Sequence, residues 1–152
     1  MAKPHRPPMP VAVSRAIFLF WGALLLCNAA LIADTLNADG TMRAIYPSTV
    51  AMAGIAYSMA MLIFIMAPFA YVIEQISVGE DWARLASVVL FVTVASWSLP
   101  TLLGHVHHLN SVPYWFTVSS RSAGLALAAY AIRLLYTRPA QLWFNTLNPK
   151  RC

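Results

Sequence analysis

The central part of the chain consists of two long apolar runs separated by a short charged segment. Residues 48–73 contain no formally charged side chain, and residues 85–103 form a second uncharged run. About 20 apolar residues are enough for a helix to cross a membrane, because each residue rises about 1.5 Å and the hydrocarbon core is about 30 Å thick. Both runs are long enough, so the pattern predicts a transmembrane helical hairpin whose turn is the segment 74–84.

Two further apolar runs lie on either side of this hairpin. The first begins after Arg15, and the last begins at the aromatic triplet 114–116, which is typical of membrane surfaces. The predicted fold class is therefore all-α: a polytopic membrane protein with four transmembrane helices in an antiparallel up-down bundle. We expect these helices at about residues 16–34, 48–74, 84–103 and 114–136.

Prolines and turn-forming residues set the expected ends of this domain. Residues 1–14 contain four prolines, which predict a flexible cytoplasmic arm rather than a helix. Residues 34–47 are expected to form a loop, since they include the turn-forming sequence Asn-Ala-Asp-Gly. A Thr-Arg-Pro sequence should stop the last helix, which leaves 139–152 as an interfacial cytoplasmic tail and 15–138 as the four-helix transmembrane domain.

Composition also indicates a membrane protein. The 152 residues are 60% hydrophobic and only 10% charged, whereas about a quarter of the residues are charged in an average soluble domain. The net charge of +5 does not indicate nucleic-acid binding, because most basic residues flank apolar runs, where anionic lipids and the insertion machinery account for them. The expected partner is the lipid bilayer, with no nucleic acid.

The distribution of lysine and arginine predicts how the helices are oriented. Eight of these residues lie in the arm, the central hinge and the C-terminal end, and two lie on the opposite side. Because cytoplasmic segments carry the excess of Lys and Arg, both termini are expected in the cytoplasm. The eight are Lys3, Arg6, Arg15, Arg84, Arg133, Arg138, Lys150 and Arg151, against Arg43 and Arg121.

Two short elements resemble a known group of proteins. The hinge sequence Gly-Glu-Asp-Trp-Ala-Arg at 79–84 resembles a G-x-N-W-A-R element, and Trp-Phe-Asn at 143–145 resembles a W-F or W-F-N ending. Both elements occur in a loose group of small four-helix bacterial inner-membrane proteins, in which Asn is usual where this chain has Asp81. The group is largely uncharacterised, so the resemblance implies a multi-pass protein of the bacterial inner (cytoplasmic) membrane and no reaction.

The hinge itself offers a candidate contact site at Asp81, Trp82 and Arg84. Gly79 breaks the helix, and Asp81 can cap a helix that begins at Trp82, where its charge also suits the helix N-terminus. Trp82 can anchor at the membrane surface, and Arg84 can reach lipid headgroups. A structural re-entry turn explains these residues, and a docking site for a membrane partner is the alternative.

A histidine cluster is the main candidate for ligand chemistry. His105, His107 and His108 lie within four residues, and imidazole nitrogens bind zinc or copper. No carboxylate or cysteine adjoins them in sequence, and a haem would usually need axial histidines on facing helices. A polar external loop is the alternative interpretation, and no other cofactor is expected.

Arg121 is expected seven residues into the fourth helix, where an unpaired charge in lipid is unfavourable. Asp34, at the outer end of the first helix, is expected at a similar depth. We therefore predict a structural Asp34–Arg121 ion pair. An anion-binding or substrate-gating role for Arg121 is the alternative.

Nothing in the sequence favours an enzyme, because it contains no nucleophile elbow, phosphate-binding loop, Cys-x-x-Cys motif or paired carboxylates in mid-membrane. The expected role is that of an integral inner-membrane protein that acts through contacts with membrane partners or with itself. One alternative is a small oligomeric transporter or channel. A second is a metal- or haem-binding membrane protein that uses the external histidine cluster.

Overall fold

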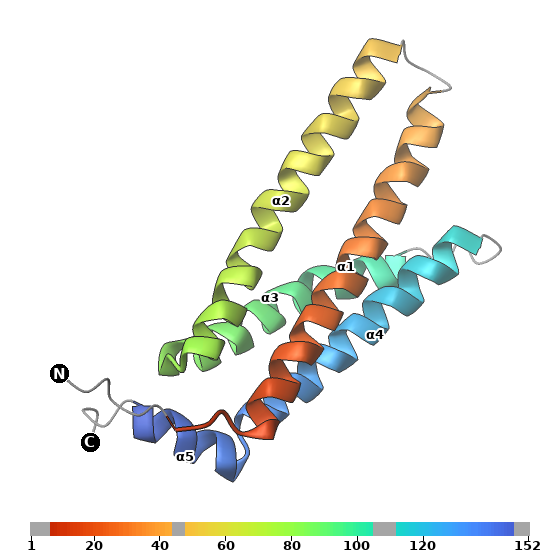
Figure 1. Cartoon of the computed structure of the whole chain (residues 1–152). Helices are drawn as coiled ribbons and strands as arrows, with labels where there is room; N and C mark the ends of the chain where they lie inside the picture. The colour runs from red at the N-terminus through yellow and green to blue at the C-terminus, as the bar shows by residue number, and fades with distance from the viewer. Residues whose placement is uncertain (1–6, 44–47, 105–111, 148–152) are drawn as a thin grey trace.

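The computed structural model describes residues 7–43, 48–104 and 112–147, with side chains at 7–33, at most of 56–98 and at 115–147. These residues form five helices and no strand, which confirms the all-α class for the described part of the chain (Figure 1). The helices are α1 (Val11–Arg43), α2 (Ser48–Val78), α3 (Asp81–Gly104), α4 (Val112–Leu135) and α5 (Arg138–Leu147).

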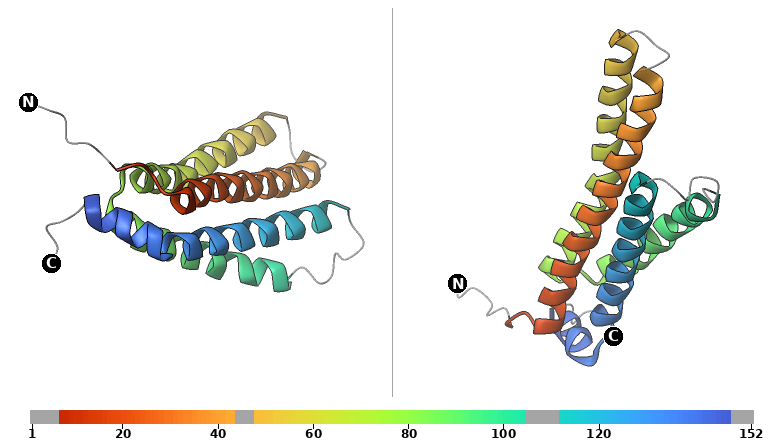
Figure 2. Two further views of the ribbon diagram at one scale, coloured as in Figure 1. Left: turned by 60° about the horizontal axis from the view of Figure 1, so that its bottom comes forward. Right: turned by 90° about the vertical axis from the view of Figure 1, so that its right-hand side faces the viewer.

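The four long helices form two antiparallel hairpins, α1–α2 and α3–α4, and the most extensive contact between the hairpins is that of α1 with α4. The hairpins converge at one end of the molecule and diverge toward the other (Figures 1 and 2). The convergent end holds residues 7–16, 76–84 and 135–147, including all of α5, and we call it the base. Its position follows from the short α2–α3 connection and from α5, which both hold helices together at this end.

Small residues allow α1 and α4 to approach closely. Ala16, Ala23 and Ala30 recur every seventh residue of α1, and all three are buried. On α4, a Cβ added to Gly124 would lie 2.9 Å from the Cys27 sulfur and 3.2 Å from the Ala23 carbonyl oxygen. Close backbone approach at small side chains is typical of helices that pack within lipid, where burial of apolar surface gives no driving force between helices.

Large apolar side chains on the long helices point outward. Phe64 on α2 and Trp97 on α3 are 78% and 79% exposed, and Phe18 on α1 is exposed to a similar degree. Away from the base, the described buried side chains are small, whereas the larger buried ones lie near the base. The small set comprises Ala23, Ala30, Ser87, Ser98, Thr117, Ser120, Gly124 and Ala131.

One segment, Val11–Ala33 of α1, is long and apolar enough to cross a membrane by length and composition. It is the one span that meets this criterion within the described residues, and few of its residues are buried in the protein. The apolar segment predicted near the N-terminus is thus present as a helix.

Helix α1 extends beyond the predicted helix at both of its ends. The helix begins at Val11, because the Pro10 carbonyl oxygen accepts hydrogen bonds from the Val13 and Ser14 amides (3.0 and 3.2 Å). Proline is compatible with a helix start, so only the residues before Val11 can remain an extended arm. At its other end α1 continues to Arg43 through the expected loop, since a glycine weakens a helix by only about 1 kcal/mol and an asparagine by less.

The expected tail after residue 138 contains helix α5. Pro139 lies in its first turn, where proline has no intrahelical hydrogen bond to lose. The apolar residues Ala140, Trp143, Phe144 and Leu147 follow the i, i+3, i+4, i+7 pattern of an amphipathic helix. Pro139 therefore ends one helix and starts the next, rather than ending helical structure altogether.

Candidate functional site

The α2–α3 hinge is a tight turn that requires glycine. Gly79 has a φ of 92°, a conformation that residues with a Cβ rarely adopt. Its amide donates hydrogen bonds to the Gln75 and Ile76 carbonyl oxygens, both at 3.1 Å, and thereby satisfies the last carbonyls of α2. The hinge residues Glu80 and Asp81 follow directly, and α3 begins at Asp81.

The start of α3 differs from the expected cap. The Glu80 carbonyl oxygen accepts a hydrogen bond from the Ala83 amide at 3.2 Å, so Glu80 occupies the position that precedes the helix. The Asp81 carboxylate instead pairs with Arg84, whose Nη1 lies 3.1 Å from Asp81 Oδ1. Asp81 still lies in the first turn of α3, where a negative charge interacts favourably with the helix dipole.

Arg84 is enclosed by aromatic rings instead of reaching outward to lipid headgroups. Its side chain is only 12% exposed. The guanidinium carbon lies 4.6 Å from the ring centroid of Tyr136 and 5.0 Å from that of Phe144. Both distances are within the range of cation–π attraction, which is stronger where water is excluded. Arg84 therefore acts as a link between α3, the end of α4 and α5.

Helix α5 covers the hinge from below. Phe144 is fully buried, and Trp143 packs edge-on against it with ring centroids 5.0 Å apart. A Cβ added to Gly79 would overlap Leu147 Cδ1 and lie 3.2 Å from Trp143 Cη2. The Trp143 indole N–H also donates a hydrogen bond to the Pro7 carbonyl oxygen at 3.4 Å, so α5 contacts the N-terminal arm as well.

The two sequence elements that resemble the inner-membrane group therefore pack against each other. The hinge at 79–84 contributes Gly79 and Arg84, and the Trp-Phe-Asn element at 143–145 contributes two buried rings to the same contact. Sequence reasoning singled out both elements but missed their contact, and it did not identify Tyr136. The apolar spacing of α5 was the signal that could have indicated a buried face.

Trp82 is the hinge candidate whose side chain remains available at the surface. It is 40% exposed, and its ring lies 6.1 Å from that of Tyr71 on α2 at a tilt of 35°. Leu85, one turn further along α3, is also exposed. Of the three candidate hinge residues, Asp81 and Arg84 pair with each other and Trp82 faces outward. We call Tyr71, Trp82 and Leu85 the hinge surface.

The predicted metal ligands His105, His107 and His108 lie outside the described residues. Within the part of the chain that the structure does describe, no three or more His, Cys, Asp or Glu side chains gather in a way that could hold a metal ion. The histidine site accordingly stays a prediction.

The structure describes the side chain of Arg121 but not that of Asp34, its predicted partner. Arg121 lies on α4 one turn before Gly124, and it is close enough to interact electrostatically with Cys27 on α1. Asp34 lies on α1 about two turns beyond Cys27, and its side chain is not among those that the structure describes. The two residues are thus on helices that pack together, and the ion pair itself stays a prediction.

Comparison of the chain with known protein families, curated proteins and solved structures finds no match.

Proposed function

We propose that the protein is an integral inner-membrane protein whose helices α1–α4 cross the bilayer. The observation that carries this proposal is the distribution of side-chain size, with large apolar residues outside and small residues between α1 and α4. Exposed side chains such as Phe18, Phe64 and Trp97 would be unfavourable in water, whereas lipid solvates them. The apolar helix at Val11–Ala33 supports the same placement.

In this arrangement the base lies on the cytoplasmic side. Arg15 and Arg138 are exposed there and Arg133 is exposed next to it, and lysine and arginine accumulate on the cytoplasmic side of membrane proteins. The described chain begins at Pro7 and ends at Leu147, both at the base, so both termini would then be cytoplasmic. Fusions of a reporter after Arg138 should report the cytoplasm, and fusions beside Asp39 should report the periplasm. A periplasmic reading after Arg138 would overturn this orientation.

The protein acts, in this proposal, through contacts with a membrane partner or a second copy rather than by catalysis. The base is held by Arg84, Phe144 and the Gly79 turn, so it presents the hinge surface on a fixed support. Exposed aromatic side chains are enriched at protein contacts and in their energetically dominant positions. An aromatic anchor that meets only lipid is the competing explanation for Trp82.

Photo-crosslinking in native membranes distinguishes a protein contact from a lipid anchor. A photoreactive residue is placed at Trp82 or Leu85, and Leu142 serves as the control because it is 65% exposed at the same end of the molecule on α5. Discrete protein adducts from the two hinge positions and none from Leu142 are expected. Adducts of lipid alone from all three positions would contradict the contact role.

A further inference from the structure

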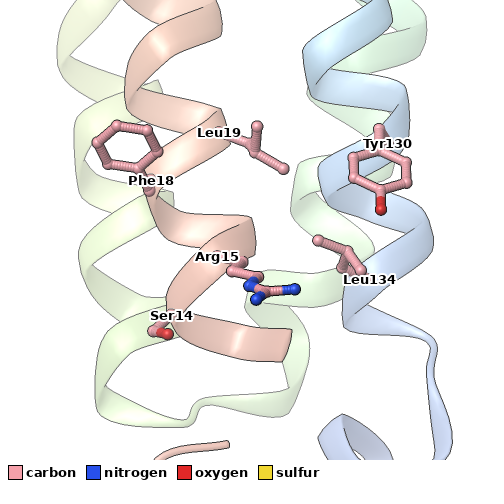
Figure 3. A pocket seen from close by; sticks show the side chains of 6 residues that line it. All are labelled: Ser14, Arg15, Phe18, Leu19, Tyr130 and Leu134. Atoms are coloured by element: carbon pink, nitrogen blue, oxygen red, sulfur yellow. The ribbon is translucent and has the colours of Figure 1, made fainter. Parts of the chain in front are cut away.

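An open groove runs between the ends of α1 and α4 next to the base. Its volume is about 380 Å³, toward the lower end of the range of about 300–1,000 Å³ for small-molecule sites. Figure 3 shows the six side chains around it, three of which have polar ends. The lining residues are Ser14, Arg15, Phe18, Leu19, Tyr130 and Leu134.

The polar groups of the groove lie toward the base, where Leu134 is beside them, and its other end is apolar. The Arg15 guanidinium extends into the space between the two helices, and the Tyr130 hydroxyl points toward the same end of the groove (Figure 3). Phe18 and Leu19 lie further along α1, away from the base (Figure 3). A ligand that matches this order needs a negatively charged group next to an apolar portion.

Arg15 is the charge that such a ligand would meet. It is exposed, and no carboxylate pairs with it within the described residues. The Tyr130 hydroxyl offers a second hydrogen-bond donor to the same ligand. The Ser14 hydroxyl already donates to the Val11 carbonyl oxygen at 3.1 Å, so it contributes polarity rather than a free donor.

We propose that this groove binds one anionic phospholipid, with its phosphate held by Arg15 and Tyr130 and an acyl chain lying along Phe18 and Leu19. The inference rests on the proposed membrane placement, which puts the groove at the cytoplasmic headgroup level. A guanidinium forms paired, charge-assisted hydrogen bonds with phosphate oxygens. The cytoplasmic leaflet carries the anionic lipids, and basic pockets between membrane helices on that side bind their headgroups.

Charge complementarity favours a lipid over an uncharged apolar occupant. Arg133 and Arg138 are also exposed at this end of the molecule and add to the positive potential around the groove without lining it. Arg133 and Arg138 attract anionic lipids in general, whereas Arg15 would hold one lipid at a defined position in the groove. This difference provides a matched control, because Arg138→Gln removes a charge of the same sign from the same end of the molecule.

The test uses full-length protein in mild detergent with added phosphatidylglycerol or phosphatidylcholine, and retained lipid is measured by native mass spectrometry. We expect one tightly retained phosphatidylglycerol and little phosphatidylcholine. Arg15→Gln should weaken retention about tenfold, as expected for the loss of a charged hydrogen bond, and Tyr130→Phe about threefold. Arg138→Gln should leave retention within about twofold of the unaltered chain.

Several outcomes would overturn the proposal. Unchanged retention in Arg15→Gln would show that the groove does not hold the phosphate, and equal losses in Arg15→Gln and Arg138→Gln would show only diffuse attraction. Displacement of the lipid by millimolar inorganic phosphate would identify a simple anion site. Insertion of the protein into liposomes is measured in parallel. Normal insertion with unselective lipid retention would contradict only the proposed lipid binding in the groove. Failed insertion of the unaltered chain would contradict both the membrane placement and the lipid binding.

Discussion

The guanidinium carbon of Arg84 lies 5.0 Å from the ring centroid of Phe144, although the two residues are 60 positions apart in the chain. The contact joins the start of α3 to α5, and the Asp81 carboxylate pairs with the same guanidinium. A charged side chain that is mostly withdrawn from solvent is favourable only while its partners remain in place. The stability of the base should therefore depend strongly on α5.

Phe144→Ala should lower the free energy of unfolding by about 3–5 kcal/mol, because it leaves a cavity beside a fully buried position and uncovers Arg84. Thermal unfolding in detergent measures this loss. Leu142→Ala is the matched control on the same helix, since Leu142 is exposed and should change stability by less than about 0.5 kcal/mol. Equal effects of the two substitutions would show that α5 does not hold the base.

Gly79→Ala should displace α5. The positive φ alone makes a residue with a Cβ unfavourable by about 1–2 kcal/mol, and the added methyl group would overlap Leu147. Limited proteolysis with chymotrypsin should then cleave after Phe144, which is fully buried in the unaltered chain, faster than in that chain. Gly22→Ala is the control, because its new Cβ would lie 3.7 Å from Leu127 Cδ1, an ordinary contact. Protection of Phe144 from chymotrypsin in Gly79→Ala would contradict this account.

Gly124→Ala should weaken the packing of α1 against α4. The new Cβ would lie 2.9 Å from the Cys27 sulfur and 3.2 Å from the Ala23 carbonyl oxygen, so the Cys27 side chain must shift and the helix backbones must separate slightly. Overpacking of this kind destabilises proteins by about 1–3 kcal/mol. Adding Cys27→Ala should restore part of the loss, since it removes the nearer atom. Melting temperatures of the single and double variants measure this, and purely additive losses would exclude the contact as the cause.

Asp34→Asn and Arg121→Gln should each lower the melting temperature if the two residues form an ion pair. Loss of one partner leaves the other charge poorly solvated, and about 1–3 kcal/mol is expected because Arg121 is partly exposed. The double variant should recover part of the loss. A double-mutant cycle without coupling would exclude the pair.

The apolar runs predict the long helices well, because hydrophobicity over 20 or more residues is a strong local signal. Local signals mislead at helix ends. Pro139 predicts the end of a helix, yet a proline is also accepted in the first turn of the next helix, as in α5. The Asn-Ala-Asp-Gly sequence reads as a turn, yet α1 continues through it to Arg43. Tertiary packing overrides such weak propensities.

The candidate site shows a different limit. Gly79 and Arg84 were recognised as hinge residues, and the Trp-Phe pair was recognised separately. Their contact depends on how α5 folds back beneath α2 and α3, which no spacing within either element specifies. The burial of Arg84 follows from that fold, so an arginine expected to face lipid headgroups instead faces two aromatic rings.

The position of α5 also affects how the protein is made. Domains form as their residues leave the ribosome, from the N-terminus onward, and α5 follows all four long helices in the chain. Until α5 has been synthesised, the Arg84 guanidinium lacks the Phe144 ring, and Trp143 and Leu147 do not yet fill the space beside Gly79. The nascent protein thus passes through a stage in which its helical hairpins are present but α5 does not yet connect them at the base. Completion of α5 ends that stage by fixing the hairpins together.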